Sequence, residues 1–178
     1  VAAVESILAI GAVPVIVNID ESLNMDPLAL EEKINIKTKV IMPVHMLGMP
    51  ADMSAIKNIA NKYNLKIVED NCEAIGATLG NDYLGTIGDI GVMSFDHGKA
   101  LTTGEGGMLL SNSKDLDEIA REYHDHGHQN NPTLPRGRDT KRLVGFNYRM
   151  TEIQAAIGKV QLRKLDRLLV ENAKRYDA

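Results

Sequence analysis

The chain has 178 residues, 44% of them hydrophobic and 25% charged, which suits one globular domain with a sizeable core. Its formal net charge of −4 leaves no basic surplus to neutralise phosphates, so nucleic acid is excluded as the main partner. The single cysteine, Cys72, cannot form an internal disulfide, and no apolar run approaches the ~20 residues of a membrane helix, so no membrane is expected and the expected location is the cytoplasm.

Both ends of the chain have the character of cuts inside a longer protein. The sequence begins at Val1 within an apolar run at helical spacing, without an initiating Met. It ends at Ala178, shortly after a long helical pattern. No linker or repeat divides the residues between, so we expect a single domain from the middle of a larger protein.

The first half of the chain alternates helical patterns with short β-branched runs. Gly11 suits the position just past a helix end, and Asp26 with Pro27 fits an N-cap followed by proline in the first turn. Pro43 within a strand pattern indicates an edge position or a strand end. The expected elements are a helix over 1–10, a strand over 13–17, a helix over 27–34, a strand over 39–45, a helix over 51–63 and a strand over 66–69 that ends at Asp70.

The second half closes with a long helical pattern. Ser113 caps a helix, and Thr151 with Gln154 fits a capping box. Residues 124–142 are polar and aperiodic, so we expect a long loop there, of a kind that is usually functional or disordered. The expected elements are strands over 90–95 and 107–111 and helices over 114–123 and 152–169. The apolar face of the last helix comprises Ile153, Ile157, Val160, Leu165, Leu168 and Leu169.

Short apolar strands that alternate with helices predict an α/β fold. The expected arrangement is a three-layer α/β/α sandwich, with helices covering both faces of a mostly parallel sheet. Ligands of such sheets bind beyond the carboxyl ends of the strands. His45, Asp70 and Phe95 all fall at such ends, although a histidine in this position is more often structural than catalytic.

The stretch from Ser94 to Gly107 is the most informative part of the sequence. Ser94 is followed five residues later by Lys99, and residues 102–107 are rich in glycine. A lysine can form an imine with an aldehyde cofactor, a hydroxyl and backbone N–H groups can hold its phosphate, and a carboxylate such as Asp70 can pair with its ring nitrogen. Plainer roles stay open, because Asp70 could cap a turn and the glycines could serve only a tight turn.

Several separated segments, in the same order, resemble the sugar aminotransferases of the DegT/DnrJ/EryC1/StrS family, which have the aspartate aminotransferase fold (fold type I). The similar segments are residues 43–48, 69–74, 88–91, 94–107, 145–150 and 152–156. The resemblance implies that residues 1–178 are the central part of the large domain that binds pyridoxal 5′-phosphate (PLP). It also implies that an N-terminal segment and a small C-terminal domain are missing, so this chain alone is expected to be inactive.

The resemblance further implies roles for single residues. Lys99 would form the imine with PLP, Asp70 would pair with the pyridine nitrogen, and Ser94 would hydrogen-bond the phosphate. Asn147 would reach the phosphate of the neighbouring subunit's cofactor in a homodimer. Glu73 would lie beside the ring hydroxyl, where the family pattern has Gln, and a carboxylate there leaves its role open. The implied reaction moves an amino group from an amino acid, with L-glutamate as the expected donor, to a nucleotide-linked keto-sugar.

Other functions are weighed against this one. A sugar 3-dehydratase of the same family would have histidine at the lysine position, so Lys99 argues against it. A non-catalytic regulatory or binding relative stays open, although the intact site residues argue against it. A nicotinamide dehydrogenase is discounted, because no Gly-x-Gly-x-x-Gly joins a strand to a helix. His124, His126 and His128 lack the spacing of a metal site, so no metal is expected. The resemblance implies that their loop lies near the nucleotide-sugar site, so substrate contact is the better interpretation.

Overall fold

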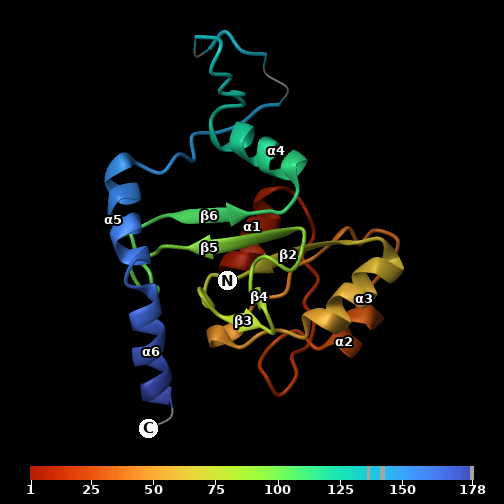
Figure 1. Cartoon of the computed structure of the whole chain (residues 1–178). Helices are drawn as coiled ribbons and strands as arrows, with labels where there is room; N and C mark the ends of the chain where they lie inside the picture. Colours follow the sequence, from red (N-terminus) through yellow and green to blue (C-terminus); the bar gives the residue numbers. More distant parts are fainter. Residues whose placement is uncertain (136, 141–142, 177–178) are drawn as a thin grey trace.

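The computed structural model describes residues 1–135, 137–140 and 143–176. Within these residues a four-stranded sheet has the order β1 (Val40–Ile41), β2 (Lys66–Asp70), β5 (Ile90–Ser94) and β6 (Gly107–Leu110) (Figure 1). The strands β1, β2 and β5 are parallel, and β6 is antiparallel to β5. The fold is α/β with a mostly parallel sheet, so the fold class predicted from the sequence is confirmed.

The remaining elements surround this sheet. A hairpin of β3 (Thr78–Leu79) and β4 (Asp82–Tyr83), which was not predicted, lies in the connection between β2 and β5. The helices are α1 (Ala2–Ala9), α2 (Pro27–Lys33), α3 (Met53–Tyr63), α4 (Lys114–His124), α5 (Glu152–Leu162) and α6 (Leu165–Tyr176), with a short 3₁₀ turn, η1 (Met46–Gly48). None of the described helices combines the length and apolarity needed to cross a membrane.

Polar side chains determine where four of the described helices begin. Asp26, Asp52 and Ser113 each accept a hydrogen bond from a first-turn backbone N–H, ahead of α2, α3 and α4. Thr151 and Gln154 form a complete capping box at α5. An N-cap of this kind stabilises a helix by about 1 kcal/mol. The caps predicted at Asp26, Ser113 and Thr151 are therefore confirmed.

A hydrophobic core packs α2 and α3 against one face of β1 and β2. Ile41 and Ile67 are register partners in these strands and are almost completely buried. Met53 and Ile56 of α3 are fully buried in the same cluster. Burial of each such side chain contributes about 1.5–3 kcal/mol, so this cluster fixes the positions of β1 and β2. Its other buried members are Leu30, Ala51, Ile59 and Ala60.

The strand predicted over 13–17 is wrong. The segment has no strand pairing among the described residues, and Val13 and Ile16 are 85% and 70% exposed. Only Val17 packs against the core. A β-branched run favours extended backbone, but a strand also needs a hydrogen-bonded neighbour, which this segment lacks here.

The strand predicted over 39–45 is shorter than expected. Regular pairing covers Val40–Ile41, and a single bridge from Val44 to Asp70 follows beyond Pro43. Pro43 has no N–H to donate, but its carbonyl accepts from the Asp70 N–H at 2.8 Å. β1 lies at the edge of the sheet, as Pro43 predicts.

The long helix predicted over 152–169 is divided into α5 and α6. The Lys164 N–H bonds to the Gln161 carbonyl at 2.9 Å, three residues back rather than four, and this tighter turn separates the two helices. Neither α5 nor α6 has a buried residue among those described, so their apolar face is not covered within this chain. Leu165 and Leu169 are half-buried, and both lie close to Gly76.

The loop expected over 124–142 begins one residue later, because α4 includes His124. Its described residues contain no helix or regular strand, only an isolated bridge between Asp125 and Asn147. Residues 136, 141 and 142 lie outside the described part of the chain.

Candidate active site

The carboxyl ends of β2 and β5 place two of the predicted site residues on one face of the sheet. Asp70 ends β2 and is the register partner of Val92 in β5. Because side chains alternate along a strand, Ser94 points to the same face as Val92 and therefore as Asp70. The Asp70 carboxylate accepts from the Cys72 N–H at 3.1 Å, and the Ser94 hydroxyl accepts from the Asp96 N–H at 3.3 Å.

Lys99 approaches this edge from the turn that follows β5. The Lys99 N–H bonds to the Asp96 carbonyl at 3.0 Å, which fixes the turn. The Lys99 Nζ lies 3.6 Å from the Glu73 Oε1, with side chains 24% and 38% exposed. The structure therefore brings Lys99 and Glu73 together as an ion pair that is only partly open to solvent.

The thiol of Cys72 lies within the influence of these charged groups. Burial, followed by the Asp70 carboxylate, raises the pKa of Cys72 to about 12; the Lys99 ammonium acts in the opposite direction and Glu73 in the same direction. Asp70, Glu73 and Lys99 thus all influence the titration of the same thiol. The thiol stays protonated at neutral pH, which is unfavourable for a nucleophile and agrees with a packing role.

The glycine-rich turn over residues 102–107 is closed by backbone hydrogen bonds on Phe95. The Phe95 N–H bonds to the Gly106 carbonyl at 2.8 Å, and the Phe95 carbonyl accepts from the Thr103 N–H at 3.0 Å. Gly104 has a φ of +85°, a conformation that favours glycine. These contacts account for the glycines through a tight turn, and a role in holding phosphate stays a prediction.

The contacts of Asn147 are with its own neighbours and with Asp125. It is exposed and forms an isolated bridge with Asp125, and its side chain accepts from the Arg149 N–H at 3.4 Å. Among the described residues, it forms no hydrogen bond or ion pair with Asp70, Glu73 or Lys99 of the same chain. Its predicted role toward a neighbouring subunit stays a prediction.

Glu69 is a residue whose importance the sequence did not reveal. Its side chain is completely buried and accepts backbone hydrogen bonds from Gly85 at 2.8 Å, Ile87 at 2.7 Å and Gly88 at 2.5 Å. Burial by itself would raise the pKa of Glu69, but hydrogen bonds from His45 and from these three N–H groups bring it below its ordinary value. Glu69 therefore holds the loop over residues 85–88 against β2.

His45 has a structural role beside Glu69. It is completely buried, and its Nδ1 accepts from the Ala51 N–H at 3.2 Å. The Nε2 consequently carries the hydrogen and donates to the Glu69 carboxylate at 3.0 Å. Both ring nitrogens are engaged, so the strand-end histidine is a hydrogen-bonded structural residue.

Possible metal ligands gather in one place among the described residues, on the turn after β5. Asp96, His97 and Glu105 have ligand atoms within 4.8 Å of one another. His97 and Glu105 are exposed, and the His97 Nδ1 already pairs with the Asp96 carboxylate at 2.6 Å. In the loop of histidines, His128 pairs with Asp139 at 3.1 Å.

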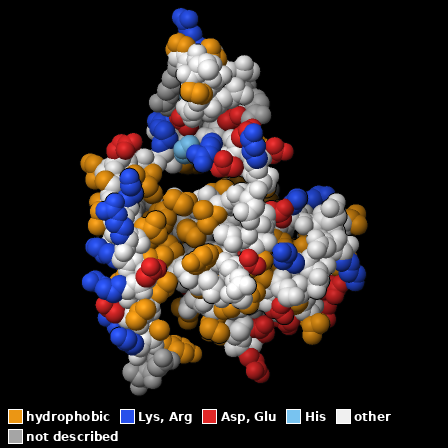
Figure 2. Space-filling view, in the orientation of Figure 1, with side chains coloured by type: hydrophobic (Ala, Val, Ile, Leu, Met, Phe, Trp, Pro, Cys, Tyr) orange, Lys and Arg blue, Asp and Glu red, His pale blue; other side chains and the backbone are white. Residues whose placement is uncertain are grey.

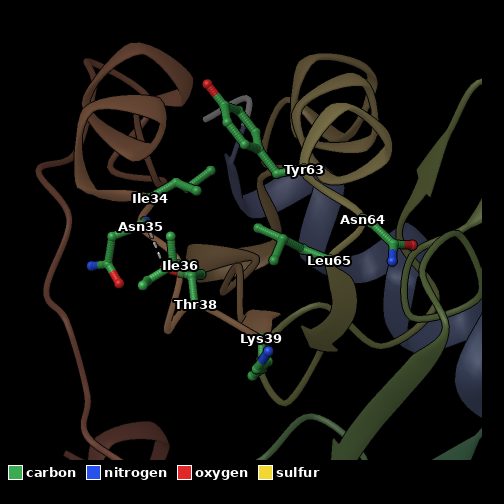
Figure 3. Close-up of a pocket in the computed structure, with 8 residues that line it drawn as sticks. All are labelled: Ile34, Asn35, Ile36, Thr38, Lys39, Tyr63, Asn64 and Leu65. Carbon is green, nitrogen blue, oxygen red and sulfur yellow. Dashed lines mark hydrogen bonds between the residues drawn. The ribbon is translucent and has the colours of Figure 1, made fainter.

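A groove lies at the opposite end of the sheet. It has a volume of about 380 Å³ and is lined by residues 34–36, 38–39 and 63–65 (Figure 3). These residues directly precede β1 and β2, so the groove is at the amino ends of the strands. Parallel sheets bind ligands at the carboxyl ends, where Asp70 and Lys99 lie, so we do not assign the active site to this groove.

The donor set at the carboxyl ends fits PLP in its chemistry. An aldehyde cofactor with a basic ring nitrogen and a phosphate requires an amine, a carboxylate and a hydroxyl. These groups are present as the half-buried Lys99, Asp70 of β2, and Ser94 of β5 on the same face of the sheet.

Comparison with known proteins defines the class as an α/β domain of aminotransferase type. The solved structure of an aminotransferase from Psychrobacter cryohalolentis superimposes with a TM-score of 0.87 at 38% identity, over 93% of this chain and 44% of that chain. The model of the DegT/DnrJ/EryC1/StrS aminotransferase family matches residues 1–178. The chain belongs to this family, and the resemblance drawn from its motifs is confirmed.

Curated relatives give the same assignment. The GDP-perosamine synthase of Caulobacter vibrioides is 42% identical over 167 residues, which are 93% of this chain and 44% of that protein. The GDP-perosamine synthase of Escherichia coli O157:H7 is 40% identical over the same share of each chain. The chain thus spans less than half the length of these relatives.

Proposed function

We propose that the protein containing this chain is a PLP-dependent aminotransferase that acts on a nucleotide-linked keto-sugar, with an amino acid, L-glutamate, as the donor. The observation that carries the proposal is that the Lys99 amine pairs with Glu73 at the carboxyl ends of β2 and β5, where Asp70 and Ser94 share one face of the sheet. The family match over the whole chain and the names of its relatives support the same reaction class.

Each site residue has a task that follows from its chemistry. When bound, PLP supplies an aldehyde that condenses with amines and a ring that accepts the electron pair left when a proton leaves carbon. Asp70 would hold the ring nitrogen in its protonated form, and Ser94 would donate to the phosphate. Lys99, once its amine is free, would take the proton from carbon and return it at the neighbouring centre. Glu73 would lie beside the ring hydroxyl.

The setting of the site belongs to the same proposal. Residues 1–178 would be the central part of the large PLP-binding domain, and the working protein would be a cytoplasmic homodimer. Asn147 would complete the site of the neighbouring subunit. Its exposed position is compatible with that role.

A spectroscopic experiment on the purified whole protein tests this function. We expect a visible absorption band that borohydride abolishes, leaving the cofactor attached to the peptide containing Lys99. The Lys99→Ala variant should lose the band and at least about 10²-fold of the transaminase turnover, with unchanged circular dichroism. The matched control is Lys57→Ala, an exposed lysine on α3. A cofactor that dialyses away would indicate the dehydratase, and the absence of any band would indicate a binding relative.

A further inference from the structure

Glu73 connects two parts of the candidate site through its two carboxylate oxygens. Its Oε1 lies 3.6 Å from the Lys99 Nζ. Its Oε2 accepts from the backbone N–H of Leu47 in η1 at 3.3 Å. One side chain therefore contacts both the reactive amine and the turn that follows β1.

The turn at Leu47 has a reason to need such a contact. Leu47 has φ +53° and ψ 28°, a left-handed conformation that is unfavourable for a residue with a side chain. Its side chain is 74% exposed, so packing does little to hold it in place. A hydrogen bond from its N–H to a charged acceptor is about twice as strong as one to a neutral acceptor, and it offsets part of that cost.

The free amine of Lys99 also needs an interaction partner. Under the proposed function the amine is not bound to the cofactor while it moves a proton, and a nearby anion would then hold its protonated form in position. Among the described residues, the ion-pair partner of Lys99 is Glu73. An amide in this position could accept from Leu47, but it could not balance the ammonium charge.

We propose that Glu73 is a positioning residue that holds the uncombined ammonium group of Lys99 and ties it to η1. Its importance for turnover rests on the proposed function, whereas the contact itself does not depend on the cofactor. Glu73 stands where the resemblance leads us to expect Gln, and its negative charge would let it pair with Lys99, which Gln could not do.

Chemical labelling of the cofactor-free protein tests the contact with Lys99. The acetylation rate of Lys99 by acetic anhydride would be measured by peptide mass spectrometry relative to exposed Lys57. We expect labelling about two- to fivefold faster in Glu73→Gln and Glu73→Ala than in the wild type, the range of a partly exposed ion pair. The control Glu32→Gln, an exposed glutamate on α2, should label like the wild type.

Amide exchange separates the two contacts. Exchange at the Leu47 N–H should be faster in Glu73→Ala and close to wild type in Glu73→Gln, because the amide oxygen of Gln can still accept. If Glu73 has only a structural role, Glu73→Gln should resemble the wild type both in Lys99 acetylation and in Leu47 amide exchange. That result would overturn the proposal.

The wild-type protein provides a test that does not require a variant to fold. Raising the salt concentration from 0.05 to about 1 M shortens the screening length to about 3 Å, so Lys99 labelling should rise relative to Lys57. Labelling of Lys99 that is independent of both salt and Glu73 would exclude the ion pair. A missing visible band in the preceding experiment would instead reject the function and leave this result standing.

Discussion

Glu69 and Asp70 are adjacent carboxylates in β2 whose side chains leave opposite faces of the sheet. Glu69 is buried under the loop over residues 85–88, while Asp70 accepts from the Cys72 N–H. The Glu69 carboxylate is satisfied by backbone N–H groups and by His45. Under the proposed function, Glu69 would support the structure and its neighbour Asp70 would contact the cofactor.

The Glu69→Gln variant should be less stable than the wild type by about 2–4 kcal/mol. An amide keeps the shape of the side chain, but its NH₂ group is itself a donor and would face backbone N–H donors. At least one buried donor would then be left unpaired. Urea unfolding followed by circular dichroism measures the difference. Glu5→Gln, at an exposed glutamate on α1, is the matched control. Equal stability of the two variants would contradict the role assigned to Glu69.

The same carboxylate predicts a pH dependence. The pKa of Glu69 in the folded protein lies below its ordinary value of 4.5, so the folded state favours the ionised form. The resulting stability is present above about pH 4.5 and is lost as the pH falls through the lower folded-state pKa. Unfolding measured between pH 3 and 6 should therefore show a steeper loss for the wild type than for Glu69→Gln. Parallel curves would contradict this prediction.

The sequence indicates the candidate site residues at the strand ends, but not the residues that hold the surrounding loops in place. Asp70 and Lys99 could be placed together because both follow parallel strands, and parallel strands end at one edge. Glu69 gave no signal, because a charged residue inside a strand has the same pattern whether it is exposed or buried under a loop. The contact from Glu73 to Leu47 was also hidden, since it depends on the left-handed turn at Leu47.

At the scale of elements, the backbone of the loop over residues 85–88 approaches β5 very closely. A Cβ added at Gly91 would lie 1.9 Å from the Gly85 carbonyl oxygen, which is backbone and cannot rotate away. This approach is possible because Glu69 holds the loop against β2. The spacing between β2, β5 and the loop therefore depends on a glycine in the middle of a strand.

The Gly91→Ala variant should be destabilised by about 3 kcal/mol or more, because the loop and strand must separate to admit a methyl group. Thermal unfolding compared with Gly98→Ala measures the effect. Gly98 is a suitable control, since a Cβ there would meet only the Asp96 carboxylate at 3.4 Å, an ordinary contact. Similar melting temperatures for both variants would show that the loop can move.

Elements with local signals were predicted well, and elements that depend on distant partners were not. The caps at Asp26, Ser113 and Thr151 are properties of a few adjacent residues, and all three were identified. The strand expected over 13–17 needed a neighbour that no local pattern reveals. The break between α5 and α6 contains neither Gly nor Pro, so only the hydrogen bond from Lys164 to Gln161 shows it.

At the scale of the whole molecule, α5 and α6 leave much apolar surface uncovered. Ile153 and Val160 of α5 are 76% and 50% exposed, and Phe146 and Tyr148, which flank Asn147, are 51% and 65% exposed. Figure 2 shows apolar side chains gathered between α5 and the strands, with Lys and Arg along the outer edge of both helices. Exposed apolar surface of this extent is typical of regions that meet another surface. It is compatible with the proposed homodimer, in which the Asn147 segment faces a second subunit.

Mixing two inactive variants of the whole protein tests whether subunits share their sites. If Asn147 serves the neighbouring subunit, Lys99→Ala and Asn147→Ala homodimers should each be impaired. A heterodimer formed by denaturing and refolding them together has one site with both residues intact and one site with neither. Because random pairing makes half of the dimers mixed, about a quarter of the wild-type activity should return.

The outcome depends only on which chain supplies Asn147. If the residue acts within its own subunit, each site of the heterodimer lacks one residue and mixing restores nothing. Mixing Lys99→Ala with Asp70→Asn is the matched control, because both residues lie around Cys72 of the same chain and no intact site can form. Recovery of about a quarter of the wild-type activity in the first mixture alone would establish a site built from two chains.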